Sequence, residues 1–179
     1  MRHVPNVLTL MRLASVPFAA WLMVHGREIP AFWLFAAAGL TDAVDGAVAR
    51  LCDARTALGA WLDPLADKAL LVTTFVVLGV RDVLPLWLVV LVVLRDVLIL
   101  AYAAVYMLAG AFTASPILVS KVNTAVQVGL AALVLARLAY GWGGDMLEQA
   151  LVYAAAGTTV ASGAAYLVGV SRTIPASDG

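Results

Sequence analysis

Charge is scarce in this chain of 179 residues, because only 12% of them are Asp, Glu, Lys or Arg. Soluble domains carry about 25% charged residues, and 64% of the residues here are hydrophobic, so the composition excludes an ordinary soluble protein and indicates a membrane protein. Eleven basic and eleven acidic residues leave no net charge, which gives no support to nucleic acid as a partner. The single cysteine, Cys52, excludes a disulfide within the chain.

Long hydrophobic runs fill most of the sequence, and short stretches of turn residues or charges separate them. A membrane-spanning helix needs about 20 mostly apolar residues. The segments of about this length are 8–24, 31–51, 57–80, 84–108, 117–140 and 147–170. We therefore expect an all-α integral membrane protein with six transmembrane helices in one bundle. The short breaks leave no room for a soluble domain, so residues 1–179 are expected to form one domain.

The N-terminal stretch "VPNVLTLMRL" has a polar start and an arginine close behind it, which predicts a short interfacial segment before the first span. Basic residues near helix ends indicate orientation, because they collect on the cytoplasmic side. If the N-terminus is cytoplasmic, the basic residues on that side are Arg2, Arg12, Arg50, Arg55, Lys121 and Arg172, and those on the other side are Arg27, Arg81 and Arg137. This imbalance predicts that both termini lie in the cytoplasm.

Four aspartates interrupt the second and third hydrophobic segments. Asp42 and Asp45 are three residues apart and share one face of a helix, and Asp63 and Asp67, four apart, share a face of the next. The two segments are joined by a short break and are expected to run antiparallel. Asp45 then lies level with Asp63, and Asp42 level with Asp67, so the spacing predicts one cluster of four carboxylates.

Such a cluster is unfavourable by itself, because each aspartate in a membrane helix costs about 2.5–3.5 kcal/mol on insertion scales and the four repel one another. One or two divalent cations would remove the repulsion. Carboxylate oxygens suit hard cations such as Mg²⁺ or Mn²⁺, and no histidine or cysteine joins the cluster to favour zinc. A structural polar cluster and the ion site of an ion-coupled transporter are the alternatives. The transporter hypothesis predicts two matching halves of the chain with broken helices. It is not favoured, because the four aspartates all lie in the first half.

The full pattern is Asp42-x2-Asp45-Gly46-x2-Ala49-Arg50-x8-Gly59-x3-Asp63-x3-Asp67. It resembles the signature of the CDP-alcohol phosphotransferase family of integral membrane enzymes without a departure. The opening "PNVLTLMRLASVP" is also similar to the start of bacterial members that make phosphatidylglycerophosphate or cardiolipin. The resemblance extends over essentially the whole chain.

The resemblance implies roles for individual residues. The metal ligands would be Asp42, Asp45, Asp63 and Asp67, which would hold one or two Mg²⁺ or Mn²⁺ ions against the diphosphate of a CDP-linked lipid. Asp67 would also act as the general base on the acceptor hydroxyl, and CMP would leave. The contacts to the CDP-lipid would come from Asn6, Thr9, Asp42, Gly46, Arg50 and Gly59.

The acceptor site is less well marked. Arg95 and Asp96 lie in the middle of the fourth segment, where they either satisfy each other or leave Arg95 to bind an acceptor phosphate. Lys121 is either an interfacial anchor or a second phosphate ligand. Asn123, Thr124 and Gln127 fall on one helix face and either bind neighbouring helices or contact the acceptor.

The stretches "SKVNTAVQ" and "RDV" look like the cardiolipin synthase branch of the family. That likeness implies CDP-diacylglycerol as donor and phosphatidylglycerol as acceptor, with cardiolipin and CMP as products. The alternative is a phosphatidylglycerophosphate synthase, which uses glycerol 3-phosphate. By the same resemblance we expect a homodimer in the lipid bilayer of a bacterial inner membrane, with the active site facing the cytoplasm.

Overall fold

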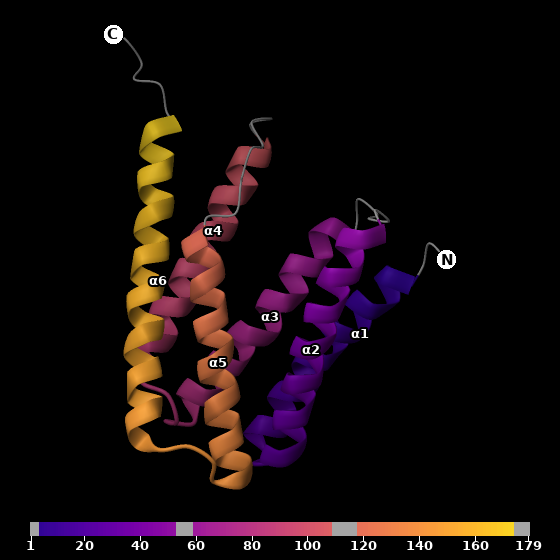
Figure 1. Ribbon diagram of the computed structural model, residues 1–179, viewed down its shortest axis with the longest axis vertical. Coiled ribbons are helices and arrows are strands. Elements are labelled where there is room, and N and C mark those ends of the chain that lie inside the picture. Colours follow the sequence, from indigo (N-terminus) through magenta and orange to yellow (C-terminus); the bar gives the residue numbers. More distant parts are fainter. Residues whose placement is uncertain (1–3, 53–58, 109–117, 174–179) are drawn as a thin grey trace. The chain divides into compact units, whose positions relative to one another are not determined.

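The computed structural model describes residues 4–52, 59–108 and 118–173, and these residues form six α-helices and no strand. The helices are α1 (Val4–Val24), α2 (Glu28–Cys52), α3 (Gly59–Val80), α4 (Leu86–Leu108), α5 (Leu118–Tyr140) and α6 (Asp145–Thr173) (Figure 1). Side chains are described for residues 13–41, 68–101 and 118–166. The prediction of an all-α fold with six helices in this order is confirmed.

The bounds of each helix agree with the expected segments to within a few residues. The main difference is at the N-terminus, where α1 is continuous from Val4 to Val24. The expected interfacial segment is therefore not a separate element but forms the first turns of α1. Pro5 is compatible with a helix start, because the first helical residues need no hydrogen-bond donor.

In the part of the chain that the structure describes, α5 is the one helix long and apolar enough by length and composition to cross a membrane. Shorter apolar helical stretches are Leu13–Val24, Glu28–Thr41 and Lys68–Val80. The number of membrane spans therefore stays a prediction.

The chain divides into two compact units. Unit 1 comprises Met1–Leu84 and Ala131–Gly144, and unit 2 comprises Pro85–Leu130 and Asp145–Gly179. The helix α5 contributes its first part to unit 2 and its second part to unit 1. The expectation of one domain over 1–179 stays a prediction.

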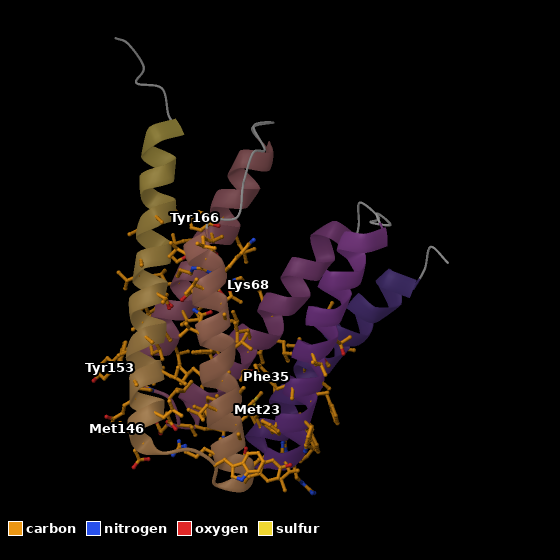
Figure 2. The ribbon with its side chains drawn as sticks, in the orientation of Figure 1. Met23, Phe35, Lys68, Met146, Tyr153 and Tyr166 are labelled. Carbon is orange, nitrogen blue, oxygen red and sulfur yellow. The ribbon has the colours of Figure 1, made fainter. Side chains whose placement is uncertain are left out.

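In unit 1, α1 packs against both α2 and α3 (Figure 1). Among its buried apolar side chains are Met23 and Phe35, which Figure 2 labels, and Phe75 and Leu78 of α3. Each apolar side chain of this size contributes about 1.5–3 kcal/mol when it is fully buried. The core of this unit thus forms where α1 meets its two neighbours.

The helices α1 and α3 end in the same type of C-terminal turn, which contains a residue with positive φ. Gly26 has a φ of 67°, and the N–H of Arg27 donates to the carbonyl of Leu22 at 2.9 Å, which closes α1 with a Schellman turn. Asp82, with a φ of 56°, closes α3 through an equivalent hydrogen bond from Val83.

An ion pair joins the C-terminal end of α3 to the N-terminal end of α2. Arg81, at the end of α3, donates to Glu28 in the first turn of α2 at 2.5 Å. Each charge has the sign that its helix end favours, because α-helices are positive at the N-terminus and negative at the C-terminus.

Aromatic side chains gather at one end of unit 1. The indole N–H of Trp33 donates to the hydroxyl of Tyr140 at 2.7 Å. The ring of Tyr140 also stacks on Trp142 with centroids 5.0 Å apart and meets Phe32 edge-on at 5.7 Å. Trp33, Tyr140 and Trp142 are all exposed, as is typical of aromatic residues at a membrane–water interface.

In unit 2, α4 packs along α6 (Figure 1). The buried face of α4 combines apolar residues, among them Leu88 and Val92, with an ion pair, whereas a helix on the surface of a soluble protein keeps its charged residues exposed. The ion pair consists of Arg95 and Asp96, each 3% exposed. The exposed large side chains of α4 are apolar and include Leu86, Trp87, Val90, Leu94, Val97, Leu98 and Leu100. The helix α6 also exposes large side chains, among them Met146 and Tyr153 (Figure 2).

Candidate active site and buried polar network

The four aspartates occupy two helices of unit 1. Asp42 and Asp45 lie in the C-terminal half of α2, and Asp63 and Asp67 lie in the N-terminal half of α3. Their side chains lie outside the described residues, so the carboxylate cluster stays a prediction. Among the side chains that are described, which do not include the four aspartates, no group of three or more His, Cys, Asp or Glu could hold a metal ion.

The residues expected to contact the CDP-lipid fall on the same helices and on α1. Gly46 and Arg50 lie in α2, Gly59 begins α3, and Asn6 and Thr9 lie in the first turns of α1. Their side chains also lie outside the described part. Lys68, the residue after Asp67, is half buried (Figure 2).

Arg95 is fully described, and its guanidinium is held from three helices of unit 2. Its Nη1 donates to Oδ1 of Asp96 on the same helix at 2.6 Å. Its Nη2 donates to the hydroxyl of Ser120 on α5 at 2.7 Å and to that of Ser162 on α6 at 2.5 Å. The pairing of Arg95 with its neighbour Asp96, one of the two interpretations drawn from the sequence, is therefore present. Its Nε is buried and has no hydrogen-bond partner among the described residues.

A second polar group lies next to Arg95 along α5 and α6. The amide Nε2 of Gln127 donates to the Thr159 hydroxyl at 3.1 Å, and that hydroxyl donates to Oδ1 of Asn123 at 2.9 Å. The Thr158 hydroxyl also donates to Asn123, at 2.9 Å. Asn123 and Gln127 are both 0% exposed, so the expected inward polar stripe on α5 is present for these two residues.

The third member of that stripe behaves differently. The Thr124 hydroxyl is half buried and donates to the backbone carbonyl of Ser120, one turn earlier in its own helix, at 3.1 Å. Of the two interpretations of the stripe, hydrogen bonding between helices is what Asn123 and Gln127 do in the structure.

Lys121 follows Ser120 in the first turn of α5 and is exposed. The hydrogen bond from Arg95 to Ser120 thus attaches the turn that carries Lys121 to α4. The two cations proposed for the acceptor occupy one unit, with Arg95 buried and Lys121 accessible.

Comparison with known proteins decides the family. The model of the CDP-alcohol phosphatidyltransferase family matches residues 2–161. The chain belongs to the CDP-alcohol phosphatidyltransferase family. The match includes all four aspartates of α2 and α3, and in unit 2 it includes Arg95, Ser120 and the polar residues of α5.

Several curated relatives are similar over nearly the whole chain. A human cardiolipin synthase (CMP-forming) is 36% identical over 91% of this chain and 60% of its own length. A fusion protein of Schizosaccharomyces pombe, cardiolipin synthase (CMP-forming) with a mitochondrial hydrolase, is 35% identical over 92% of this chain and 30% of its own. A chloroplastic CDP-diacylglycerol–glycerol-3-phosphate 3-phosphatidyltransferase of Oryza sativa is 32% identical over 92% of this chain and 56% of its own length.

Two of these names give cardiolipin as the product, and the third gives glycerol 3-phosphate as a substrate. The chain spans between about a third and three fifths of the length of these relatives. Family membership therefore fixes the class of protein, and the acceptor is a separate question.

The partners of Arg95 on α5 and α6 could not be named from the sequence. Ser120 and Ser162 are small polar residues in apolar helices, and such residues are common where membrane helices pack. The one signal available was the spacing of Thr159 and Ser162, three residues apart on α6. That spacing indicates a shared face and gives no information about which helix the face meets.

Proposed function

We propose that this chain is a phosphatidyltransferase that joins the phosphatidyl group of CDP-diacylglycerol to phosphatidylglycerol, with cardiolipin and CMP as products. The observation that carries the proposal is the eight-position aspartate signature, placed on two helices of a chain that belongs to the CDP-alcohol phosphatidyltransferase family. An ion-coupled transporter, considered from the sequence, has no support from this membership.

The donor site would be built on α1, α2 and α3. Asp42, Asp45, Asp63 and Asp67 would hold one or two Mg²⁺ or Mn²⁺ ions, since an all-oxygen donor set suits hard divalent cations. When bound, such ions neutralise the charge of the diphosphate and of the leaving phosphate. The remaining contacts to the CDP-lipid would come from Asn6, Thr9, Gly46, Arg50 and Gly59.

Asp67 would take the proton of the acceptor hydroxyl, because a general base must reach the attacking oxygen. That oxygen forms a new bond to the phosphorus that carries the diacylglycerol. The bond between this phosphorus and the bridging oxygen of the diphosphate breaks, and CMP leaves with the electron pair. The acceptor thus gains the phosphatidyl group without any oxidation or reduction.

Both candidate acceptors bring a phosphate, and we propose that Lys121 and Arg95 bind it. Lys121 is exposed and is available to an incoming anion. Arg95 retains a buried Nε–H without a partner in the described part, and a phosphate oxygen is a strong acceptor for such a donor.

Phosphatidylglycerol is favoured as acceptor by the sequence "SKVNTAVQ" and by the cardiolipin synthases among the relatives. Glycerol 3-phosphate is the second candidate, supported by the rice relative.

We place the protein in a lipid bilayer because α4 buries an ion pair and exposes leucine, valine and tryptophan. This arrangement is unfavourable in water and favourable in lipid. From the basic residues and the family likeness, the proposal extends to a homodimer in a bacterial inner membrane, with both termini and the active site on the cytoplasmic side.

The test is product analysis with purified protein in mixed micelles. CDP-diacylglycerol is supplied with either phosphatidylglycerol or glycerol 3-phosphate, and the lipid product is identified by its mass. Cardiolipin formed only with phosphatidylglycerol supports the proposal. Phosphatidylglycerophosphate as the only product would contradict the acceptor assignment and leave the donor chemistry in place, whereas no transfer to either acceptor would contradict both.

A further inference from the structure

Arg95 makes its contacts with residues to which the proposed chemistry gives no role. We infer that Asp96, Ser120 and Ser162 are positioning residues, which hold the Arg95 guanidinium in one orientation and leave its Nε–H for the acceptor phosphate. This inference rests on the proposed function, because it concerns the acceptor site of that reaction.

The hydrogen-bond count of the guanidinium supports this role. Arginine has five N–H donors, and Asp96, Ser120 and Ser162 use three of them. Both terminal nitrogens are thus held by protein atoms, whereas the buried Nε has no partner among the described residues. Buried donors are nearly always satisfied, so this atom marks the position where a partner is missing. A charge-assisted hydrogen bond to a phosphate oxygen would supply that partner.

The chemical character of Asp96, Ser120 and Ser162, the three residues that bind the guanidinium, also fits an anion-binding site. Asp96 neutralises Arg95, which keeps the pair inside an apolar unit at a lower energy than a lone cation. Two serine hydroxyls fix the other side of the guanidinium without adding negative charge. A second carboxylate there would hold the arginine equally well and would repel the incoming phosphate.

Ser120 links the network to the other proposed phosphate ligand. It precedes Lys121 in the first turn of α5, so its hydrogen bond to Arg95 fixes the turn that carries the lysine. Arg95 and the helix turn that carries Lys121 are therefore joined by one contact. Loss of the Ser120 hydroxyl should disturb the binding of the acceptor and leave the donor site on α2 and α3 unaffected.

Serine variants should still fold, because the neighbouring hydrogen bonds between α5 and α6 do not involve Arg95. Gln127, Asn123 and Thr159 would continue to join these helices. Thr158 provides a matched control, since its hydroxyl donates to Asn123 and to the backbone of its own helix rather than to a group that holds Arg95. Thr158→Ala removes a hydroxyl from α6, four residues before Ser162, and leaves the hydrogen bonds of the Arg95 guanidinium in place.

The experiment measures KM for the acceptor at saturating CDP-diacylglycerol, and KM for CDP-diacylglycerol at saturating acceptor. The acceptor is whichever of phosphatidylglycerol and glycerol 3-phosphate the wild-type protein uses. Ser120→Ala and Ser162→Ala should each raise the acceptor KM by about 3- to 10-fold, the usual effect of losing one hydrogen bond, with the donor KM within about twofold. Ser120→Thr, which keeps the hydroxyl at a half-buried position, should restore the wild-type value, and Thr158→Ala should retain it.

An unchanged acceptor KM in both alanine variants would overturn the inference while the proposed function stands. An equal rise in both KM values, or loss of folding in both variants by thermal melting, would show a structural role and would also overturn it. Absence of wild-type turnover with either acceptor would instead overturn the proposed function, and the inference with it.

Discussion

The buried ion pair of α4 offers a sharp test of how burial controls the contribution of a charge. The perturbation is Asp96→Ala, which removes the carboxylate 2.6 Å from Arg95. The two side chains are only 4% and 3% exposed, so water cannot replace the lost partner. The arginine would remain charged in an apolar environment, supported by the hydroxyls of Ser120 and Ser162 alone.

The expected magnitude follows from measured effects of breaking buried pairs, which lie at about 3–5 kcal/mol. The two remaining serine contacts compensate in part, so we expect a loss of about 3 kcal/mol in the free energy of unfolding. Unit 1 contains a matched pair of similar length, Arg81–Glu28 at 2.5 Å, whose side chains are 26% and 17% exposed. Glu28→Ala should lose only about 1 kcal/mol, since solvent screens this pair and the helix-end charge adds little.

The assay is unfolding of the purified protein in mixed micelles by added denaturing detergent, followed by circular dichroism. A double variant, Arg95→Met with Asp96→Leu, should recover most of the loss, because apolar residues of similar volume often replace a buried pair without a net cost. Equal losses for Asp96→Ala and Glu28→Ala would refute the reasoning that burial sets the size of the effect. Failure of the double variant to recover stability would show that the charge itself is required.

Two further predictions concern the aspartates of α2 and α3. Prolonged treatment with EDTA should abolish turnover, and Mg²⁺ or Mn²⁺ should restore it, because the proposed ligands are all carboxylates; full activity after exhaustive chelation would exclude a metal role. Asp67→Asn should reduce kcat by about 100-fold or more, as expected for loss of a general base, while binding of CDP-diacylglycerol, measured by calorimetry, persists. Near-normal turnover of Asp67→Asn would require a different base, and Asp42→Asn, expected to weaken donor binding as well, serves as the comparison.

The sequence by itself determined the helices. Long apolar runs bounded by "HGREIP", "RDVLP" and "GWGGD" predicted six helices whose bounds agree with the structure to within a few residues. Hydrogen bonds within a helix are local, so a run of helix-compatible residues and its breaks are sufficient to define it. Only the start of α1 was interpreted differently, because a polar opening does not by itself interrupt a helix.

The sequence also determined the family, since the aspartate signature depends on residue types at fixed spacing along two neighbouring helices. It gave pairing with Asp96 as one of two interpretations of Arg95, because adjacent residues need no knowledge of packing to be placed together. The inward direction of Asn123 and Gln127 followed from their spacing on one face of α5.

Only the tertiary structure decided what those faces meet. Ser120 and Ser162 became partners of Arg95 because α4, α5 and α6 are rotated so that three positions distant in sequence converge. Thr158 and Thr159 became partners of Asn123 in the same way. Helix rotation and register depend on the packing of many side chains at once, so contacts between helices cannot be derived from the spacing along any one of them.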